Sequence, residues 1–367
     1  MPVHKACIKS LKNDNMTTDV SGATGSIPQV GDDAGLICGY VFAGGEGSPM
    51  RSHARTVDAR EAAAWLASPA AASPAPEFLW LHFNLSHAHA ERWIARHAGL
   101  SDAFFETLKD GSHSTRIERD DDALIAVVND VHFDFGFEPS DIATLWISVG
   151  PRLVVTARTQ PLRSVDALRT AVRNGESPRS TVVLLEQLMR TQADGLVDIV
   201  RGVTTRIDTI EDELLGGRLD HKRARLGVLR RLLVRLQRLL APEPAALFRL
   251  LQHPPAWMAA DDAQELRGAS EEFSVVLRDM QGLQERIKLL QEEIAASVNE
   301  DNNRSLYVLT VVTVLALPIN ILAGLFGMNV GGIPLAEHKH GFWIVMAMVG
   351  GFTAVAAWVA RRGKNDR

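Results

Sequence analysis

The sequence LYVLTVVTVLALPINILAGLF at Leu306–Phe326 is the strongest structural signal in this chain. It lies within residues 305–336, where no residue is charged. A helix rises ~1.5 Å per residue, so about 20 residues cross a hydrocarbon core of ~30 Å. A second uncharged stretch, GFWIVMAMVGGFTAVAAWVA at Gly341–Ala360, follows after a short connection. Two such stretches in tandem predict two transmembrane helices near the C-terminal end of the sequence.

The residues that flank the two stretches predict their orientation. The tail at 361–367 holds four basic residues and one aspartate. Basic residues beside a membrane span tend to stay in the cytoplasm. We therefore expect a multi-pass protein of the bacterial inner membrane, with both termini cytoplasmic and only the loop at 330–341 outside. Membrane lipid is then an obligatory partner.

Composition excludes several other classes of protein. The chain has 367 residues, of which 23% are charged, as is ordinary for a globular protein. Its net charge of -5 argues against a nucleic-acid binder. Two cysteines, Cys7 and Cys38, form neither a disulfide framework nor a four-cysteine zinc site. No glycine-rich phosphate loop with a lysine is present, which excludes an ATP-driven pump. We expect no enzyme activity and no catalytic cofactor.

The part of the chain before residue 161 alternates strand and helix patterns. Apolar, β-branched runs bounded by Gly, Pro or Asp predict strands at 35–44, 78–85, 123–133, 142–149 and 152–157. Gly150-Pro151 predicts a hairpin between the last two runs. Helices are expected at 87–97 and 101–109. The acidic run at 118–122 is interpreted as a solvated hairpin turn, with a regulatory metal site as the minor alternative.

From residue 161 onward the pattern is helical. Helices are expected at 162–173, 178–215 and 220–240, with Gly216-Gly217 between the last two, and Pro242 and Pro244 after them. The helix within 218–238 carries seven arginines. We interpret it as a solvated helix that pairs with the acidic stretch Asp208–Glu213. Contact with anionic lipid headgroups is the alternative.

A heptad repeat then precedes the membrane. Nine of its ten positions are apolar, and they are Leu266, Ala269, Phe273, Val276, Met280, Leu283, Ile287, Leu290, Ile294 and, as the one polar member, Ser297. This repeat predicts one long helix from about Asp261 through the first span, roughly 100 Å in length. We expect its apolar seam to pack on the preceding helices rather than to form a free-standing coiled coil.

The first span carries a polar stripe of its own. Its members follow alternating steps of three and four, and they are Asn303, Leu306, Thr310, Thr313, Leu317 and Asn320. Extended backward, the stripe includes Asn299, Ala296, Glu292, Leu289 and Glu285. It lies opposite the heptad seam at ~100° per residue. Polar groups in a membrane helix face protein or water, so several copies around an axis would enclose a pore. Interhelical hydrogen bonding without a pore is the alternative.

These patterns predict an order of segments along the chain. We expect a flexible segment at 1–35, a cytoplasmic α/β domain at 36–160 and a cytoplasmic helical region at 161–260. A stalk helix at 261–304 then leads into the first transmembrane helix at 305–329. The outer loop at 330–341, the second transmembrane helix at 342–360 and the basic tail at 361–367 follow.

The triplet Gly327-Met328-Asn329 ends the first span, and Val330-Gly331-Gly332-Ile333-Pro334 follows it. Here the sequence resembles the CorA family of divalent metal ion transporters, whose signature is this triplet at this position. The resemblance covers nearly the whole chain after about residue 35. Phe326 stands where the family usually has Tyr, and Val330 stands where the magnesium branch usually has an aromatic residue. The continuation is most similar to the ZntB branch, which is associated with zinc.

The resemblance implies a funnel-shaped homopentamer in which the first span lines the pore and Gly327, Met328 and Asn329 form the selectivity filter. Five neutral amide oxygens from Asn329 would hydrogen-bond to the water around a divalent ion without retaining it. The expected function is transport of Zn²⁺, and the alternative is a Mg²⁺/Co²⁺ channel of the CorA type. A ring that contacts only hydration water discriminates poorly among Mg²⁺, Co²⁺, Ni²⁺ and Zn²⁺.

Further side chains are candidate metal contacts at the two ends of the span. Glu337, His338 and His340 lie in the outer loop, and Glu300 and Asp301 stand before the span, with Glu292 deeper on the stripe. Carboxylates brought together in several copies would enrich cations. The alternative is a solvated surface at each place. A non-conducting, membrane-anchored sensor is the rival from another class of protein, but an anchor requires neither the triplet nor the polar stripe.

Overall fold

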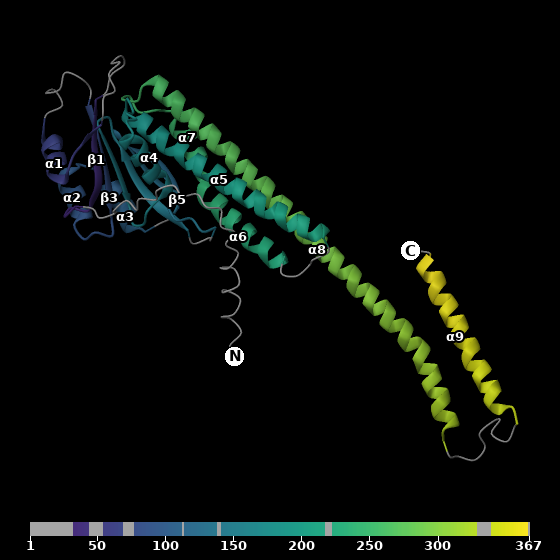
Figure 1. The fold of residues 1–367 in the computed structure, drawn as a ribbon. Helices are drawn as coiled ribbons and strands as arrows, with labels where there is room; N and C mark the ends of the chain where they lie inside the picture. Colours follow the sequence, from purple (N-terminus) through teal and green to yellow (C-terminus); the bar gives the residue numbers. More distant parts are fainter. Residues whose placement is uncertain are drawn as a thin grey trace. The chain divides into compact units, whose positions relative to one another are not determined.

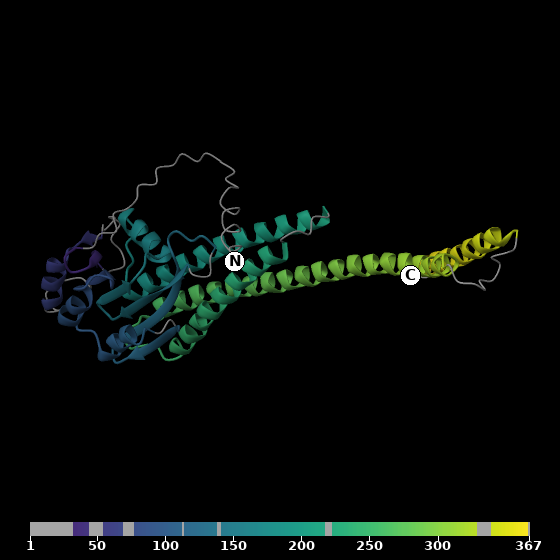
Figure 2. The same ribbon diagram turned by 90° about the horizontal axis from the view of Figure 1, so that it is seen from below.

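The computed structural model describes residues 32–43, 54–68, 77–111, 114–137, 141–216, 222–328 and 339–365. They form a mixed α/β domain, a long stalk helix and a C-terminal helix, which confirms the predicted fold class (Figures 1 and 2). By their contacts the residues divide into two units. The first comprises Met1–Asp134, Ile142–Gln192 and Pro242–Glu271, and the second comprises Phe135–Asp141, Ala193–Ala241 and Glu272–Arg367.

A seven-stranded sheet in the order β2-β1-β3-β7-β6-β5-β4 organises the first unit. Its strands are β1 (Leu36–Ala43), β2 (Arg55–Thr56), β3 (Glu77–Asn84), β4 (Arg116–Asp120), β5 (Ala123–Val131), β6 (Ile142–Val149) and β7 (Leu153–Arg158). Only β3 and β7 run parallel among these neighbours. The five predicted strands are confirmed, including the β6–β7 hairpin. The short strand β2 and the polar strand β4 were not predicted.

Each face of the sheet has its own apolar core, because successive side chains of a strand point to opposite faces. One core joins Phe42 and Trp80 to the helices α4 (Arg163–Arg173), α5 (Thr181–Leu215) and α7 (Pro242–Leu250). The other joins Leu79 and Leu81 to α1 (Ala59–Ala67), α2 (Ala90–His97) and α3 (Asp102–Lys109). The unit is therefore a three-layer α/β/α domain.

Two local signals were interpreted incompletely. Asp120 pairs with Ala123, so the turn of the β4–β5 hairpin consists of Asp121 and Asp122, and Asp121 has a positive φ of 48°. The first three residues of the acidic run at 118–122 thus belong to β4. The helix before Pro242 ends at Leu240, as predicted, but Pro242 also begins α7. Proline is favoured in the first turn of a helix, where its missing N–H is no loss.

The second unit contains α5 from Ala193 onward, the helix α6 (Lys222–Leu240), most of α8 (Ala260–Phe326) and α9 (Gly341–Asn365). The 67 residues of α8 form one continuous helix of roughly 100 Å, which confirms the predicted stalk (Figure 1). Every first position of the heptads, from Leu266 to Ile294, is buried. Within this unit α8 is held by α5 and α6, so the seam packs on preceding helices as predicted.

The hydrogen bonds and ion pairs of α8 identify these partners. Gln284 donates to Gln237 of α6 at 2.6 Å, and Arg286 pairs with Asp208 of α5 at 2.7 Å and with Glu211. Among the described residues, the predicted pairing of α6 with the acidic stretch is made by Glu213, which binds Lys222 and Arg225. Asp208 and Glu211, in the same acidic stretch, pair with Arg286 of α8 instead. Helices that are distant in sequence compete for the same carboxylates.

Candidate functional site: the exposed part of α8

The part of α8 beyond residue 294 has no buried residue up to Met328. Its most apolar 18-residue window has a mean hydropathy of 2.3, with none of that window buried. A core helix of a soluble protein would be covered on at least one side. An apolar surface of this length requires lipid or further copies of the chain to cover it. Among the described residues, α8 is a helix that is long and apolar enough to cross a membrane.

The second predicted span is described over a shorter stretch. The helix α9 runs over Gly341–Asn365, and the apolar stretch Gly341–Val355 at its beginning is the part whose side chains are described without a gap. Phe342 and Trp343 at its beginning are 69% and 70% exposed. The aromatic side chains at this end suit a membrane–water interface.

The polar stripe lies on the part of α8 that has no buried residue on any side. Its predicted members are all exposed, and they are Asn303, Leu306, Thr310, Thr313, Leu317 and Asn320. The hydroxyls of Thr310 and Thr313 donate to the carbonyls of Leu306 and Leu309, at 2.8 and 2.9 Å. Because these bonds use the donor of each hydroxyl, the oxygen lone pairs face outward as acceptors. Acceptors are the groups that a hydrated cation requires.

The helix reaches the triplet without interruption. Pro318 lies inside α8, which continues to Phe326. The N–H of Gly327 donates to the carbonyl of Ala323 at 2.9 Å. Nothing lies within 4 Å of where a Cβ on Gly324 would be, so this turn leaves room for another backbone to approach. Met328 is half exposed.

Three predicted site residues, Asn329, Glu337 and His338, lie outside the described residues. His340 is exposed immediately before α9. On α8, Glu292, Glu300 and Asp301 are exposed and make no ion pair with a described residue. Within the described ranges no three His, Cys, Asp or Glu side chains lie close enough together to hold a metal ion.

The histidines that cluster in the sequence prove to be structural or solvent-exposed. His82 is fully buried, and its ring contacts the Thr156 hydroxyl at 2.9 Å and accepts from Arg158 Nε at 2.9 Å. Burial, and then the charge of Arg158, hold the pKa of His82 well below its ordinary value. The rings of His87 and His89 lie 5.6 Å apart near the surface. This arrangement supports the α/β domain rather than catalysis.

One buried carboxyl was missed by sequence reasoning. Glu243 is 1% exposed in the first turn of α7, and Gln192 Nε2 donates to its Oε2 at 3.3 Å. Burial raises the pKa of Glu243 to about 8. An acidic residue between two prolines in PEP gives no sequence signal of burial.

This architecture matches that of known proteins. The family model of the CorA-like Mg²⁺ transporter protein matches residues 76–362. The divalent cation transporter CmaX of Pseudomonas aeruginosa is 29% identical over 334 residues, which cover 90% of this chain and 97% of that protein. The zinc transport protein ZntB of Yersinia enterocolitica is 25% identical over 297 residues, covering 81% and 90%.

Solved structures give the same result. The full-length CmaX structure matches with a TM-score of 0.74 at 29% identity, covering 90% of this chain and 98% of that one. The CorA magnesium transporter of Methanocaldococcus jannaschii matches in fold with a TM-score of 0.70 at 18% identity, covering 88% and 97%. The chain thus belongs to the CorA-like family of Mg²⁺ transporter proteins, as a membrane protein of divalent cation transport and not an enzyme.

Proposed function

We propose that this protein conducts divalent cations, Zn²⁺ first among them, through a pore enclosed by the apolar parts of five α8 helices. The observation that carries the proposal is the exposed stripe from Asn303 to Asn320 on a helix that is otherwise apolar. A single helix encloses nothing. Copies arranged around an axis place the acceptors of Thr310 and Thr313 along a common path, with lipid and α9 outside it.

The proposed topology keeps the predicted segment boundaries. The first span is 305–329, the second is 342–360, and the α/β domain, the helical region and the basic tail are cytoplasmic. The ring would stand in the bacterial inner membrane with the loop at 330–341 outside. Glu300, about 60° around the helix from Asn303, would then lie near the inner mouth and raise the local cation concentration, whereas Asp301, about 160° from Asn303, would lie on the outer side of the ring.

The proposed filter is the ring of Asn329 amides, with Gly327 allowing close approach of the backbones. Mg²⁺ gives up its water reluctantly, and a neutral ring can recognise an ion through its hydration shell. This mechanism does not select by ligand softness. Preference for zinc must therefore come from residues outside the ring, and His338 and His340 are the soft candidates in the outer loop.

Two cargo assignments compete. The ZntB relatives are named as zinc transport proteins, and the continuation after Asn329 is similar to that branch, which supports Zn²⁺. The CorA structure is named for magnesium, and CmaX for divalent cations in general, which supports the alternative of a Mg²⁺/Co²⁺ channel. Uptake measured in reconstituted vesicles with each ion at equal concentration decides between them.

The ring is tested by crosslinking Thr313→Cys in a chain whose Cys7 and Cys38 are replaced by Ser. Because the stripe faces the axis in the proposed ring, mild oxidation should give disulfide-linked subunits. The matched control is Leu315→Cys, about 160° away around the helix, which should give little product. An active protein that remains a monomer, or equal crosslinking at both positions, would contradict the ring.

Zinc preference is tested by replacing His338 and His340 together with Ala. Imidazole binds Zn²⁺ far better than Mg²⁺, so Zn²⁺ uptake should fall several-fold while Mg²⁺ uptake stays close to that of the unaltered protein. Lys339→Ala, between the two histidines, is the control for disturbance of the loop. Equal loss for both ions, or no change, would remove the histidines from this role.

A non-conducting sensor is the alternative from another class. It predicts that purified protein in vesicles passes no divalent ion above the rate of protein-free vesicles. Flux of any of the four ions under an imposed gradient would exclude it.

A further inference from the structure

One face of α6 carries arginines that its own chain leaves largely unpaired. The buried face consists of Leu226, Leu229, Leu232, Leu233, Leu236 and Leu240. The opposite face lines an open groove of about 590 Å³ together with Gln291 of α8, and its arginines are Arg230, Arg231, Arg235 and Arg238. Arg230 donates to Gln291 at 3.4 Å. None of the four forms an ion pair with a described residue.

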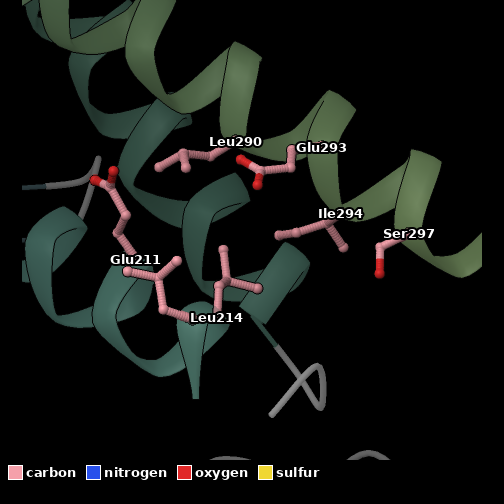
Figure 3. A pocket seen from close by; sticks show the side chains of 7 residues that line it. Glu211, Leu214, Leu290, Glu293, Ile294 and Ser297 are labelled. Carbon is pink, nitrogen blue, oxygen red and sulfur yellow. The ribbon is translucent and has the colours of Figure 1, made fainter. Parts of the chain in front are cut away.

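An acidic groove lies on the other flank of α8, where α5 ends. It has a volume of about 130 Å³ and is lined by Glu211 and Leu214 of α5 and by Leu290, Glu293 and Ile294 of α8. Figure 3 shows the side chain of Leu290 between the two glutamates, with Ile294 beyond Glu293 and Leu214 on the side of α5. Glu211 pairs with Arg286, whereas Glu293 is exposed and has no ion pair with a described residue. We call this the Glu211–Glu293 groove.

The two surfaces lie at the same height along α8. Arg230 contacts Gln291, and Gln237 contacts Gln284, so α6 runs antiparallel to α8 with one residue of α6 for each residue of α8. This register places Arg231 level with Leu290. Leu290 itself lines the Glu211–Glu293 groove, so the arginine and the groove share one level.

The two surfaces also flank the polar stripe symmetrically. At ~100° per residue, Gln284 and Gln291 lie about 100° to one side of the stripe at Glu292 and Ala296. Arg286 and Glu293 lie about 100° to the other side. The arginines of α6 and the Glu211–Glu293 groove therefore face away from each other within one chain.

We propose that the arginine surface of α6 binds the Glu211–Glu293 groove of the neighbouring copy of this chain. The inference rests on the proposed ring, in which the stripe faces the axis and the two flanks of successive copies meet. Rotational symmetry preserves height along the axis, so Arg231 of one copy arrives at the level of Leu290 and Glu293 of the next. An arginine stem packs on the apolar floor while its guanidinium reaches a carboxylate.

The position of Arg231 along α8 also favours a second copy of the chain over a lipid surface as its binding partner. Arg231 is level with Leu290, 15 residues before Ser305, where the uncharged stretch begins. At ~1.5 Å per residue this is about 22 Å from the start of the span. An arginine side chain does not bridge that distance to a headgroup.

The experiment uses two co-expressed full-length chains of different tag size, each with Cys7 and Cys38 replaced by Ser. One carries Arg231→Cys and the other Glu293→Cys, so only a contact between copies gives the mixed disulfide. We expect this product on mild oxidation. The matched control replaces Glu293→Cys by Asp198→Cys, an exposed acid on α5 that lies ten residues, about 15 Å, before Asp208. It should give at least about tenfold less.

A charge swap gives a second test without cysteines. Arg231→Glu places like charges together at the proposed contact and should lower the recovery of intact oligomer after high-detergent purification by about tenfold. Arg231→Glu combined with Glu293→Arg should restore it. Failure of the second change to rescue the first would overturn the contact.

The outcomes separate this inference from the ring itself. Crosslinking at Thr313→Cys without the Arg231–Glu293 product overturns the contact and leaves the ring in place. Absence of both products overturns the ring and the contact together. If Arg231→Glu leaves the oligomer intact but lowers the amount of copurified anionic lipid, the occupant is a lipid surface and the proposal is wrong.

Discussion

Asn329→Ala should reduce uptake of both Zn²⁺ and Mg²⁺ to the level of protein-free vesicles, while the oligomer still forms. The amide is the neutral side-chain oxygen that the sequence places at the end of the first span, directly after Gly327-Met328. Five copies would hold the hydration shell of a divalent ion at the narrowest point of the path. Alanine offers no oxygen, so the entering ion would meet an apolar ring instead.

The measurement is ion flux into proteoliposomes, together with the native mass of the purified protein. Asn302→Ala is the matched control, because it removes the same amide from the side of α8 next to the stripe rather than from the stripe. The control should transport at close to the original rate. Unaltered flux in Asn329→Ala would remove this residue from the filter, and loss of the oligomer would assign it a structural role instead.

The long helix shows how much of the fold could be predicted from sequence. The heptad seam of α8 repeats over five heptads, and no glycine pair or proline interrupts it before Pro318. The first position of every heptad is buried in the structure, from Leu266 to Ile294. Periodicity of this length has one simple solution, which is a helix with one covered side.

The failures share a physical cause. Strand β2 has two residues and β4 alternates charged side chains, so neither carries the apolar pattern on which strand prediction depends. Arg286 takes Asp208 and Glu211 because α8 lies against α5, a contact between residues about 75 positions apart in sequence. Local patterns define helices and their faces, whereas the partner of a charged side chain depends on tertiary placement.

Part of the candidate site could likewise be predicted from sequence, and part could not. The stripe residues could be chosen from spacing alone, and all six are exposed on a part of α8 that has no buried residue on any side, so their place in a pore stays a prediction. Asn329, Glu337 and His338 remain predictions, since they lie outside the described residues. In the proposed ring, the remaining contacts of the site are between copies of the chain. A single sequence indicates such contacts only through surfaces that one copy leaves exposed.

Glu243 provides the largest expected effect on stability. Its carboxyl is buried in the α/β domain beside a cavity of about 10 Å³, lined by Leu124, Val128 and Leu185 among others. That space is at the lower limit for a water molecule. Desolvation, with a smaller contribution from nearby Asp130, raises the pKa of Glu243 from 4.5 to about 8, although the bond from Gln192 opposes the shift. The folded domain therefore holds this carboxyl in its protonated form at neutral pH.

The direction of the pH dependence follows from the raised pKa. Below about pH 4.5 the folded and unfolded chains both carry the proton, and Glu243 imposes no cost. Between pH 4.5 and about 8 the unfolded chain ionises while the folded chain does not, so stability falls as pH rises, by an amount on the order of a few kcal/mol. Above pH 8 the cost stays constant. A neutral side chain of the same shape should escape it.

Glu243→Gln should therefore raise the melting temperature of the α/β domain by on the order of 5–10 °C at pH 8 and by little at pH 5. The substituted amide keeps an oxygen that can accept from Gln192, so the packing of α7 is retained. The measurement is tryptophan fluorescence during heating of the detergent-solubilised protein at pH 5, 6.5 and 8. Glu271→Gln, at an exposed position of α8, is the control and should follow the unaltered protein at every pH. A constant offset between Glu243→Gln and the unaltered protein across this range would show that Glu243 ionises in the folded state as it does in the unfolded one.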